Sequence, residues 1–506
     1  MGYAQVRAVG LIGLAGHVLT VECDVANGLP GFVISGLPDT ALNEARDRVR
    51  AAIVNSGEQW PQQRITVNLL PADLPKHGTS FDLAIAVVLL AAAGNLPVRA
   101  LDGVVLIGEL GLDGQVQAVR GVLPAVLAAA RAGVRRAIVP TANAGEATLV
   151  PGVTVRSADS LRRLIDFVSG TGQLLEPPVE DDPVEPLGPD LADVVGQEKG
   201  RRALELAAAG GHHLAFYGPP GSGKTMLAQR LPTVLPPLDD DAALAVTAVH
   251  SLAGALPPTA QLIRRPPFQA PHHTSTLAAI VGGGSGIARP GALSLAHHGV
   301  LFLDEAPHFG ASLLDALRQP LEDGYVRLRR SLGETIYPAE VQLVLAANPC
   351  PCASSAGDTA CECPALVRRR YLARLSGPLL DRVDLHITLD PVKAAALLAV
   401  DDGLESSAQV AKRVAAARDA AAARWSNQNW CLNGRVPGRT LRNPPYRLPG
   451  SVTASLTRRL DTGAISARGF DRVLRIAWTI ADLDGHSRPD AEDINEAVAL
   501  RTGSQG

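Results

Sequence analysis

The segment GPPGSGKT, residues 218–225, contains the residue types whose spacing points most directly to chemistry. Gly218 is followed by four residues and then by Gly223, Lys224 and Thr225, which is the full phosphate-binding-loop pattern. Glycines let backbone N–H groups point at phosphate oxygens, and the helix that follows adds its dipole. In such a loop Lys224 contacts the β- and γ-phosphates, and the Thr225 hydroxyl ligates Mg²⁺. The expected nucleotide-binding residues are Gly218, Pro219, Pro220, Gly221, Ser222, Gly223, Lys224 and Thr225.

A second hydrophobic stretch, LFLDE at 301–305, ends in two carboxylates. Asp304 suits the Mg²⁺ shell, and Glu305 suits orienting and deprotonating an attacking water. A third such stretch ends at Asn348, whose side chain could hold that water against the γ-phosphate. Taken alone, an acidic pair often begins a loop and an asparagine often lies in a turn. Beside a full phosphate loop, the three residues predict an enzyme that binds and hydrolyses ATP.

Four of the six cysteines cluster just after Asn348, at positions 350, 352, 361 and 363. Four thiolates suit a tetrahedral Zn²⁺ ion, but the paired ligands are one residue apart instead of the usual two to four. The sequence therefore leaves two interpretations open for Cys350, Cys352, Cys361 and Cys363, which are a structural Zn²⁺ site and reduced loop thiols.

The chain that positions these residues is expected to contain several domains, because 506 residues are too many for a single hydrophobic core. Residues 171–190 contain five prolines, six acidic residues and no basic residue, which predicts an extended linker. Before it, strand-like stretches such as RITVNLLPA, GVVLIGELGLDG and RRAIVP alternate with helical ones, which predicts an α+β or α/β module. After it, HHLAFY precedes the phosphate loop as a strand and a helix follows, so a chance glycine-rich turn is disfavoured. From about residue 391 the pattern is helical.

The overall composition excludes some functional classes. The net charge of −3 gives no global positive field, so a nucleic-acid site would have to be a local patch or arise from oligomer symmetry. No run of about 18 consecutive apolar residues is present, so we expect no membrane span. A signal peptide is the alternative for the apolar residues 6–25, but they contain Gly and His, lack a clear cleavage site and continue into strand-like sequence. We therefore expect a cytoplasmic protein.

The phosphate loop, the strand ending in Asp-Glu, the strand ending in Asn348 and the helical C-terminus together resemble an AAA+ ATPase. That resemblance implies two further site residues. The segment LLDRVDL (379–385) is similar to the one that carries the arginine finger, at Arg382, which acts in the neighbouring subunit's site. The segment SARGFDRVLR (466–475) is similar to the lid helix that carries the sensor arginine, at Arg468. The alternative for each is a surface arginine in a weak ion pair.

The whole chain resembles the YifB/ComM family of magnesium-chelatase-like AAA+ proteins. The matching stretches are ANGLPGFVISGLPDTALNEARDRVRAAI, APHHTS, GVLFLDE, NPCPC and LSGPLLDRVDL. The resemblance implies a homo-hexameric DNA motor that drives branch migration during recombination or transformation, with ATP and Mg²⁺ as cofactors. Magnesium chelation itself is not expected, because no metal-binding integrin-like region is recognisable in the sequence.

The segment 324–342 predicts a β-hairpin, with alternating VRLRR, a turn at LGE and then TIYPAEVQ. Its three arginines, Arg327, Arg329 and Arg330, would place positive charge along one arm. In a six-fold ring they could line a channel and track a phosphate backbone, whereas in isolation they would form a solvated hairpin arm. The APHHTS stretch and Gly282–Gly284 are interpreted as a pore-facing insertion.

The N-terminal module resembles the Lon protease domain, in which a serine at a helix start is the nucleophile. Ser80 takes that position, after Lys76 and Gly78, but the position of the general-base lysine is occupied by Leu123. A serine without a base is a weak nucleophile, and Lys76 lies in the same turn. We therefore predict that the module is proteolytically inactive and that Ser80 caps a helix.

The predicted architecture is a multidomain α/β protein with four parts. These are a Lon-protease-like α+β domain at 1–170, an acidic Pro-rich linker at 171–190, an AAA+ core at 191–395 and a helical lid at 396–506. The predicted function is an ATP-driven hexameric motor on single-stranded or branched DNA. The rival is an AAA+ ATPase that remodels protein partners, and an active ATP-dependent protease is disfavoured by Leu123.

Overall fold

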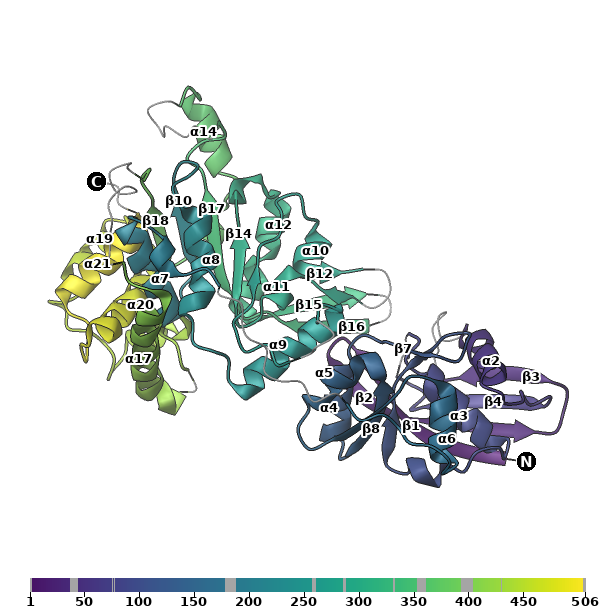
Figure 1. The fold of residues 1–506 in the computed structure, drawn as a ribbon. Coiled ribbons are helices and arrows are strands. Elements are labelled where there is room, and N and C mark those ends of the chain that lie inside the picture. Colours follow the sequence, from purple (N-terminus) through teal and green to yellow (C-terminus); the bar gives the residue numbers. More distant parts are fainter. Residues whose placement is uncertain are drawn as a thin grey trace.

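The computed structural model shows two lobes joined side by side (Figure 1). It describes residues 2–36, 44–74, 76, 78–177, 188–256, 261–284, 288–330, 333–352, 361–392, 404–428 and 430–503. The smaller lobe contains the N-terminal domain, and the larger lobe contains the phosphate loop and the C-terminal helices. None of the described helices is both long and apolar enough to cross a membrane.

The N-terminal domain is built on a seven-stranded mixed sheet with the order β3-β4-β2-β1-β5-β8-β9. β1 pairs antiparallel with β2 and parallel with β5, so the sheet changes direction at its centre. The strands are β1 (Gly2–Ile12), β2 (Ala15–Ala26), β3 (Gly31–Ser35), β4 (Arg64–Leu70), β5 (Val104–Leu106), β8 (Arg136–Pro140) and β9 (Thr154–Ala158). The helices are α2 (Ala45–Asn55), α3 (Asp82–Ala92), α4 (Val122–Arg131), α5 (Ala144–Thr148) and α6 (Leu161–Val168).

Two sequence predictions for this domain need correction. The stretch GVVLIGELGLDG is not one strand, because it divides between β5 and a separate small ribbon of β6 (Glu109–Leu110) and β7 (Val116–Gln117). The predicted linker also begins later than residue 171. Leu175 forms a bridge to Ser157 of β9, and Arg156 lies 3.0 Å from Glu176, so these residues belong to the domain. Residues 178–187 lie outside the described part of the chain.

The larger lobe is organised by a five-stranded parallel sheet with the order β11-β14-β17-β10-β18. Its strands are β11 (Phe268–Gln269), β14 (Val300–Leu303), β17 (Gln342–Ala347), β10 (Leu214–Tyr217) and β18 (Leu385–Thr388). β10, β14 and β17 are almost fully buried and read as continuous apolar runs, as expected for a parallel sheet covered on both faces. The main helices around it are α7 (Glu198–Gly210), α8 (Lys224–Val234), α9 (Asp240–Ala253), α12 (Ala311–Ala316) and α13 (Arg318–Asp323).

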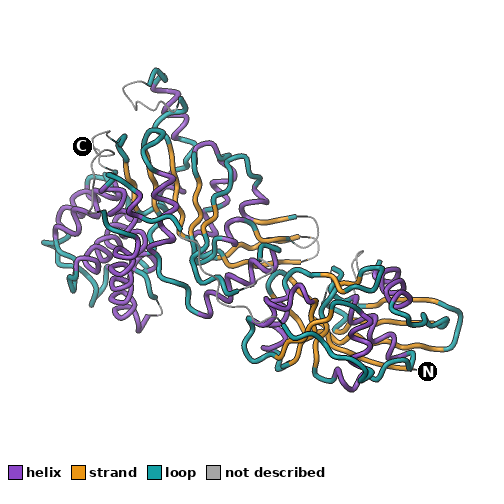
Figure 2. Tube along the Cα trace, viewed as in Figure 1, coloured by secondary structure: helices purple, strands orange, loops and turns teal. Residues whose placement is uncertain are grey.

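The C-terminal part is helical, as the sequence predicts, and occupies one end of the larger lobe (Figure 2). It consists of α17 (Ser407–Trp425), α18 (Gly438–Leu441), α19 (Ala454–Asp461), α20 (Ala467–Asp484) and α21 (Ala491–Thr502). Buried residues of α17, α20 and α21 form one hydrophobic cluster with those of α7, α8 and β10. The C-terminal helices therefore share a core with the five-stranded sheet.

Smaller elements connect these parts. They are α10 (Leu277–Val281), α11 (Ala292–Leu295), α14 (Ala365–Leu372) and α15 (Gly377–Leu380), with the antiparallel pairs β12 (Gly282–Gly283)/β13 (Arg289–Pro290) and β15 (Tyr325–Arg330)/β16 (Gly333–Pro338). The hairpin predicted at 324–342 is confirmed as β15 and β16. The turn predicted at LGE is wrong in part, because Gly333 and Glu334 are paired residues of β16, opposite Arg330 and Arg329.

The two lobes meet where α4 and α5 pack against α9. Ala248 of α9 joins the hydrophobic cluster of the N-terminal domain. At the same contact the Glu146 carboxylate accepts hydrogen bonds from Ser251 Oγ at 2.5 Å and from Asn143 Nδ2 at 2.6 Å. Burial raises the pKa of Glu146. The contact therefore combines apolar packing with a buried, hydrogen-bonded carboxyl group.

Candidate functional site

The predicted ATPase residues lie at one edge of the parallel sheet. Gly218 follows β10, Asp304 follows β14 and Asn348 follows β17, and these three strands are neighbours that run in the same direction. Parallel strands place their carboxyl ends at a common edge, where open α/β sheets bind their ligands. The sheet order therefore brings together three segments that are far apart in the sequence.

The phosphate loop has the local geometry that its glycines predict. Gly221 and Gly223 have φ values of 75° and 86°, which favour residues without a side chain, and α8 begins at Lys224. The Lys224 ammonium donates hydrogen bonds to the carbonyl oxygens of Gly218 at 2.7 Å and Pro219 at 2.8 Å. Burial lowers the pKa of Lys224, although Asp304 and Glu305 oppose that shift. The loop thus surrounds a buried cation at the N-terminus of a helix.

Thr225 and Asp304 are positioned to share a metal ion. The Thr225 hydroxyl donates to Asp304 Oδ2 over 2.8 Å. Adjacent ligands of an octahedral Mg²⁺ ion with bonds of about 2.1 Å lie roughly 3 Å apart, so the two oxygens fit neighbouring positions. The donor set, a hydroxyl and a carboxylate beside a phosphate loop, is also the type that Mg²⁺ prefers.

Glu305 is held in an unusual backbone conformation beside a histidine. Its φ of 50° lies in the left-handed region, and such strain in a residue with a side chain is typical of functional sites. Its carboxylate Oε2 lies 3.5 Å from Nδ1 of His273, and about half of its side chain is exposed. His273 is part of the APHHTS stretch that the sequence analysis interprets as a pore-facing insertion, and its contact with Glu305 adds a position beside the predicted catalytic carboxylate.

Beyond His273, aromatic rings connect Glu305 to α14. The His273 ring centroid lies 5.6 Å from that of His308, and His308 lies 5.5 Å from Tyr371 of α14. Arg374 completes the contact by donating to the Pro307 carbonyl oxygen at 3.5 Å. The segment that follows Glu305 therefore rests against the end of α14.

A cavity of about 270 Å³ lies beside the phosphate loop, between residues 196–199 and 388–392. Gln197 lines it and donates to the carbonyl oxygens of Ser222 at 3.0 Å and Asp390 at 2.6 Å. Gln197 also has a positive φ of 57°, so both its side-chain hydrogen bonds and its backbone conformation are specific to this position. The sequence analysis missed this residue, although the Gly-Gln pair immediately before α7 is a local feature that could have drawn attention to it.

Arg382 lies at the opposite edge of the sheet, just before the amino end of β18. Its guanidinium contacts Glu322 Oε1 at 2.5 Å and donates to the carbonyl oxygens of Arg318 at 3.1 Å and Pro378 at 2.6 Å. Only 9% of its side chain is exposed. The structure thus separates Arg382 from the phosphate loop of its own chain and engages it in contacts within the chain.

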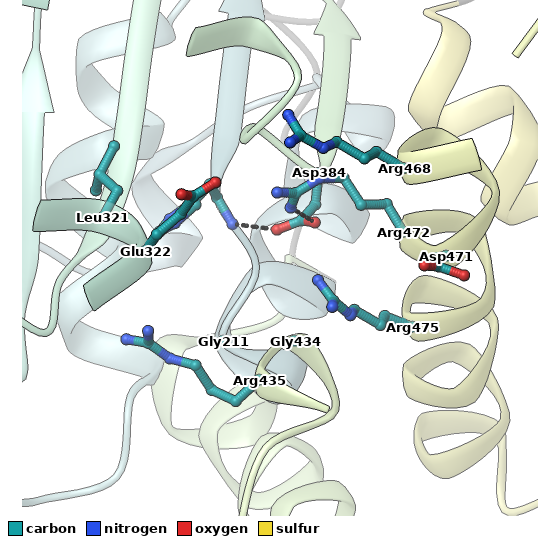
Figure 3. A pocket seen from close by; sticks show the side chains of 11 residues that line it. Gly211, Leu321, Glu322, Asp384, Gly434, Arg435, Arg468, Asp471, Arg472 and Arg475 are labelled. Atoms are coloured by element: carbon teal, nitrogen blue, oxygen red, sulfur yellow. Dashed lines mark hydrogen bonds and ion pairs between the residues drawn. The ribbon is translucent and has the colours of Figure 1, made fainter. Parts of the chain in front are cut away.

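Arg468 lines a cationic pocket of about 300 Å³ at that same edge, between the core and the lid. Figure 3 shows Arg468, Arg472 and Arg475 extending from α20 toward the pocket, with Arg435 on another wall. His213 and Asp384, which precede β10 and β18, mark the amino ends of the strands. The sensor arginine predicted from the resemblance is therefore not at its own chain's nucleotide edge.

One carboxylate that lines this pocket, that of Asp384, already forms an ion pair. Asp384 is 2% exposed, pairs with Arg472 and accepts a hydrogen bond from the His213 backbone N–H at 3.0 Å. Burial alone would raise the pKa of Asp384, but Arg472 and two histidines outweigh that effect and hold it well below its usual range. Arg468 and Arg435 are exposed, and the four arginines that line the pocket outnumber its three acidic residues, Glu322, Asp384 and Asp471, by one.

The predicted DNA-binding arginines lie on β15, but the hairpin is not purely basic. Glu334 of β16 lies 3.0 Å from both Arg327 and Arg329. Arg329 nevertheless keeps 75% of its side chain exposed, and Arg330 is also exposed. Ile336, an exposed apolar residue, shares the hairpin with them. The sequence analysis overlooked the contribution of Glu334, which partly offsets the positive charge.

The Lon-like module does not assemble a nucleophile and base at the predicted positions. Leu123 is fully buried in α4, and Lys76, the only lysine in residues 1–170, donates its Nζ to the Pro71 carbonyl oxygen. The prediction that Ser80 caps a helix is wrong, because α3 begins at Asp82 with Phe81 as its N-cap residue and no side-chain cap. The buried Asp82, which pairs with Arg48 at 2.8 Å, supplies the negative charge in the first turn instead.

The four clustered cysteines converge in space as well as in sequence. Their sulfur atoms all lie within 4.8 Å of one another. Cys350 is buried, Cys352 is exposed, and Cys361 and Cys363 are intermediate. These thiols are the candidate transition-metal ligands near the ATPase edge.

Comparisons with known proteins match almost the whole chain. Three family models match in order: "Subunit ChlI of Mg-chelatase" at residues 21–143, "Magnesium chelatase, subunit ChlI" at 190–397 and "Magnesium chelatase, subunit ChlI C-terminal" at 404–501. An uncharacterized protein of Mycobacterium tuberculosis is 50% identical over 501 residues, 99% of both chains. Escherichia coli YifB is 42% identical over 99% of this chain and 97% of its own. The Haemophilus influenzae competence protein ComM is 40% identical over 99% of this chain and 98% of its own.

A more distant similarity covers part of the chain. The Lon protease of Mycolicibacterium smegmatis is 27% identical over 175 residues, which are 33% of this chain and 22% of that protein.

Proposed function

Because the chain belongs to the YifB/ComM family of magnesium-chelatase-like AAA+ proteins, we propose that it is an ATP-hydrolysing, homo-hexameric DNA motor. Its proposed activity is ComM-like, as a branch-migration helicase or translocase in DNA recombination or transformation. The observation that carries the proposal is the convergence of Lys224, Thr225, Asp304, Glu305 and Asn348 at one sheet edge. The proposed location is the cytoplasm, where chromosomal DNA is.

The chain's own residues account for binding of ATP with Mg²⁺. Lys224 exchanges the carbonyl oxygens of Gly218 and Pro219 for phosphate oxygens, since both sets are acceptors at the same helix N-terminus. Thr225 and Asp304 offer the oxygens that hold Mg²⁺, which when bound neutralises charge on the phosphates. Gln197 lines the adjoining cavity and fixes its wall to the phosphate loop.

Hydrolysis requires a base and a positioned water. Glu305 is the base in this scheme, because its carboxylate is half exposed at the sheet edge and its backbone is held in a left-handed conformation. Asn348 follows β17, the strand next to β14, and is suited to hold the water. His273, 3.5 Å from Glu305, is positioned to orient that carboxylate.

The two predicted arginines require a neighbouring subunit. Arg382 and Arg468 lie at the amino edge of the sheet, away from the phosphate loop of the same chain. In a closed ring, one subunit's amino-edge arginines would face the next subunit's nucleotide, where positive charge stabilises the transition state. Engagement of Arg382 would first require it to leave Glu322, so the Glu322 contact is a resting-state restraint in this proposal.

DNA binding is assigned to the β15–β16 hairpin. Arg329 and Arg330 are exposed and could contact phosphates, and six copies would multiply that charge in a ring. One observation favours the second candidate function, remodelling of protein partners. Ile336 is 49% exposed on the same hairpin, and Glu334 offsets two of the arginines.

An ATPase assay with single-stranded, duplex and branched DNA distinguishes the two functions. Stimulation by DNA that is lost in Arg329→Ala/Arg330→Ala, and retained in the matched surface variant Arg131→Ala, is the expected result. Stimulation lost in both variants would indicate nonspecific electrostatics. No stimulation by any of the three DNA forms would favour the protein-remodelling function.

A structural Zn²⁺ ion at the cysteine cluster is the remaining proposed cofactor, and it does not depend on the DNA activity.

A further inference from the structure

The four cysteines after Asn348 form a compact set of sulfur atoms. Cys350 Sγ lies 2.9 Å from Cys352 Sγ, and Cys352 Sγ lies 3.6 Å from Cys361 Sγ. Cys363 completes the group, in which every sulfur lies within 4.8 Å of every other. The 2.9 Å and 3.6 Å separations both exceed the roughly 2.05 Å of a disulfide bond.

These distances suit a tetrahedral metal centre. With Zn–S bonds of about 2.3 Å, the sulfurs of a four-thiolate site lie roughly 3.8 Å apart. The Cys352–Cys361 separation of 3.6 Å is close to that value, the Cys350–Cys352 separation of 2.9 Å is shorter, and no sulfur pair of the group exceeds 4.8 Å. Two short CxC pairs from the two ends of one loop therefore approach the geometry of a closed site, despite a ligand spacing narrower than usual.

In the described residues that follow the cluster, α14 has little apolar packing. α14 begins two residues after Cys363 and projects from the larger lobe (Figure 1). Tyr371 is its one buried residue, and Leu366 and Val367 remain exposed. Apolar burial therefore contributes little to holding α14 against the larger lobe, and small units with so little core are commonly stabilised by a structural metal.

Cys350 at one end of this region, and Tyr371 and Arg374 at the other, lie close to the predicted ATPase residues. Cys350 lies two residues after Asn348, while Tyr371 packs on His308 and Arg374 donates to Pro307, just after Glu305. We propose that Cys350, Cys352, Cys361 and Cys363 bind one structural Zn²⁺ ion, which fastens α14 to the strand end that carries Asn348. The ion binds as the thiols give up their protons, with no change of oxidation state. Its second effect is to keep the Asn348 and Glu305 segments in a fixed relation.

Metal analysis of the full-length protein tests the site directly. After exhaustive dialysis against metal-free buffer, we expect about one zinc per chain, as for a closed structural site. The Cys361→Ser/Cys363→Ser variant should retain less than about a tenth of it, because even weakening the surroundings of metal ligands costs 10- to 100-fold in affinity. The matched control Cys431→Ser, at an exposed cysteine outside the cluster, should keep its zinc. Cobalt(II) added to the zinc-free protein should give the absorption of a tetrahedral thiolate complex.

Limited trypsin digestion gives a structural readout that is independent of ATP hydrolysis. Arg368–Arg370 on α14 offer cleavage sites that a fixed helix protects. Chelator-treated wild type and the double variant should be cut there at least about ten times faster than the untreated protein, while Cys431→Ser should not. Retained ATP binding by the double variant shows that the sheet is still folded, so faster cleavage is then local.

Three results would overturn the proposal. These are wild-type protein with four free thiols and no bound metal, iron in place of zinc, or zinc that remains in the double variant. Failure of the DNA assay would leave the zinc result unaffected, because neither metal content nor digestion involves DNA.

Discussion

Replacing Glu305 by glutamine separates ATP binding from ATP hydrolysis. The amide has the size of the carboxylate but cannot accept a proton from water. Lys224 and the Thr225–Asp304 pair, which form the binding part of the site, keep their contacts in this variant. We therefore expect Glu305→Gln to bind ATP with nearly unchanged affinity, whereas Lys224→Ala loses binding.

The size of the effect follows from the kind of contact that each residue makes. Removal of a positioned general base lowers turnover by about 10²- to 10⁴-fold. His273 contacts Glu305 at 3.5 Å in a partly exposed pair, and such pairs contribute about 0.2–1 kcal/mol. His273→Ala should therefore lower turnover by no more than roughly five-fold, since about 1.4 kcal/mol corresponds to ten-fold.

The assay combines fluorescent nucleotide binding with phosphate release at saturating ATP. His308→Ala, which removes the ring next to His273 but not a contact to Glu305, serves as the matched control. Wild-type turnover in Glu305→Gln would refute the assignment of the base. A loss in His273→Ala as deep as that in Glu305→Gln would show that the histidine itself acts on the reacting groups.

Three other predictions follow from the same structure. Asp384→Asn should lower the urea midpoint by the equivalent of about 3–5 kcal/mol, because it leaves Arg472 without its buried partner. Because the pKa of Asp384 is held below its usual range, its contribution to stability should be complete above the unfolded carboxyl pKa of about 3.9 and should fade as the pH falls further. Thermal unfolding scans from about pH 2 to 6 measure this loss, and a stability that stays constant over that range would contradict the prediction. Arg329→Ala should reduce the salt dependence of DNA affinity by about one unit of slope if its guanidinium neutralises one DNA phosphate, and an unchanged slope would remove Arg329 from the interface. Purified wild-type protein should not degrade casein with ATP, and proteolysis that Ser80→Ala abolishes would contradict the inactive-protease assignment.

The nucleotide edge could be predicted from sequence because its residues occupy fixed places in local patterns. A glycine-rich turn before a helix and polar residues after buried strands each have a short-range physical cause, and the parallel sheet then brings Gly218, Asp304 and Asn348 to one edge. The helices of the C-terminal part could also be predicted from the sequence, since their periodicity and caps are local features.

Long-range contacts could not be predicted in the same way. Nothing local shows that His273 reaches Glu305, or that Gln197 ties the phosphate loop to Asp390. The helix start at Asp82 could not be located from its neighbours, because a buried ion pair with Arg48, 34 residues away, supplies the charge in its first turn. In each case the deciding partner is distant in the chain.

Mixing two inactive variants tests the ring mechanism most directly. Lys224→Ala keeps Arg382 but loses its nucleotide, and Arg382→Ala keeps a sound phosphate loop but lacks the arginine offered to its neighbour. Because the structure holds Arg382 at the sheet edge opposite the phosphate loop of its own chain, mixed rings should recover part of the ATPase rate at junctions where a sound loop meets a sound arginine. The recovered rate should remain below wild type, with mixed assembly verified by differently tagged subunits and ATP binding verified for Arg382→Ala alone. Mixed rings that form at several ratios yet show no activity above either parent would contradict the account.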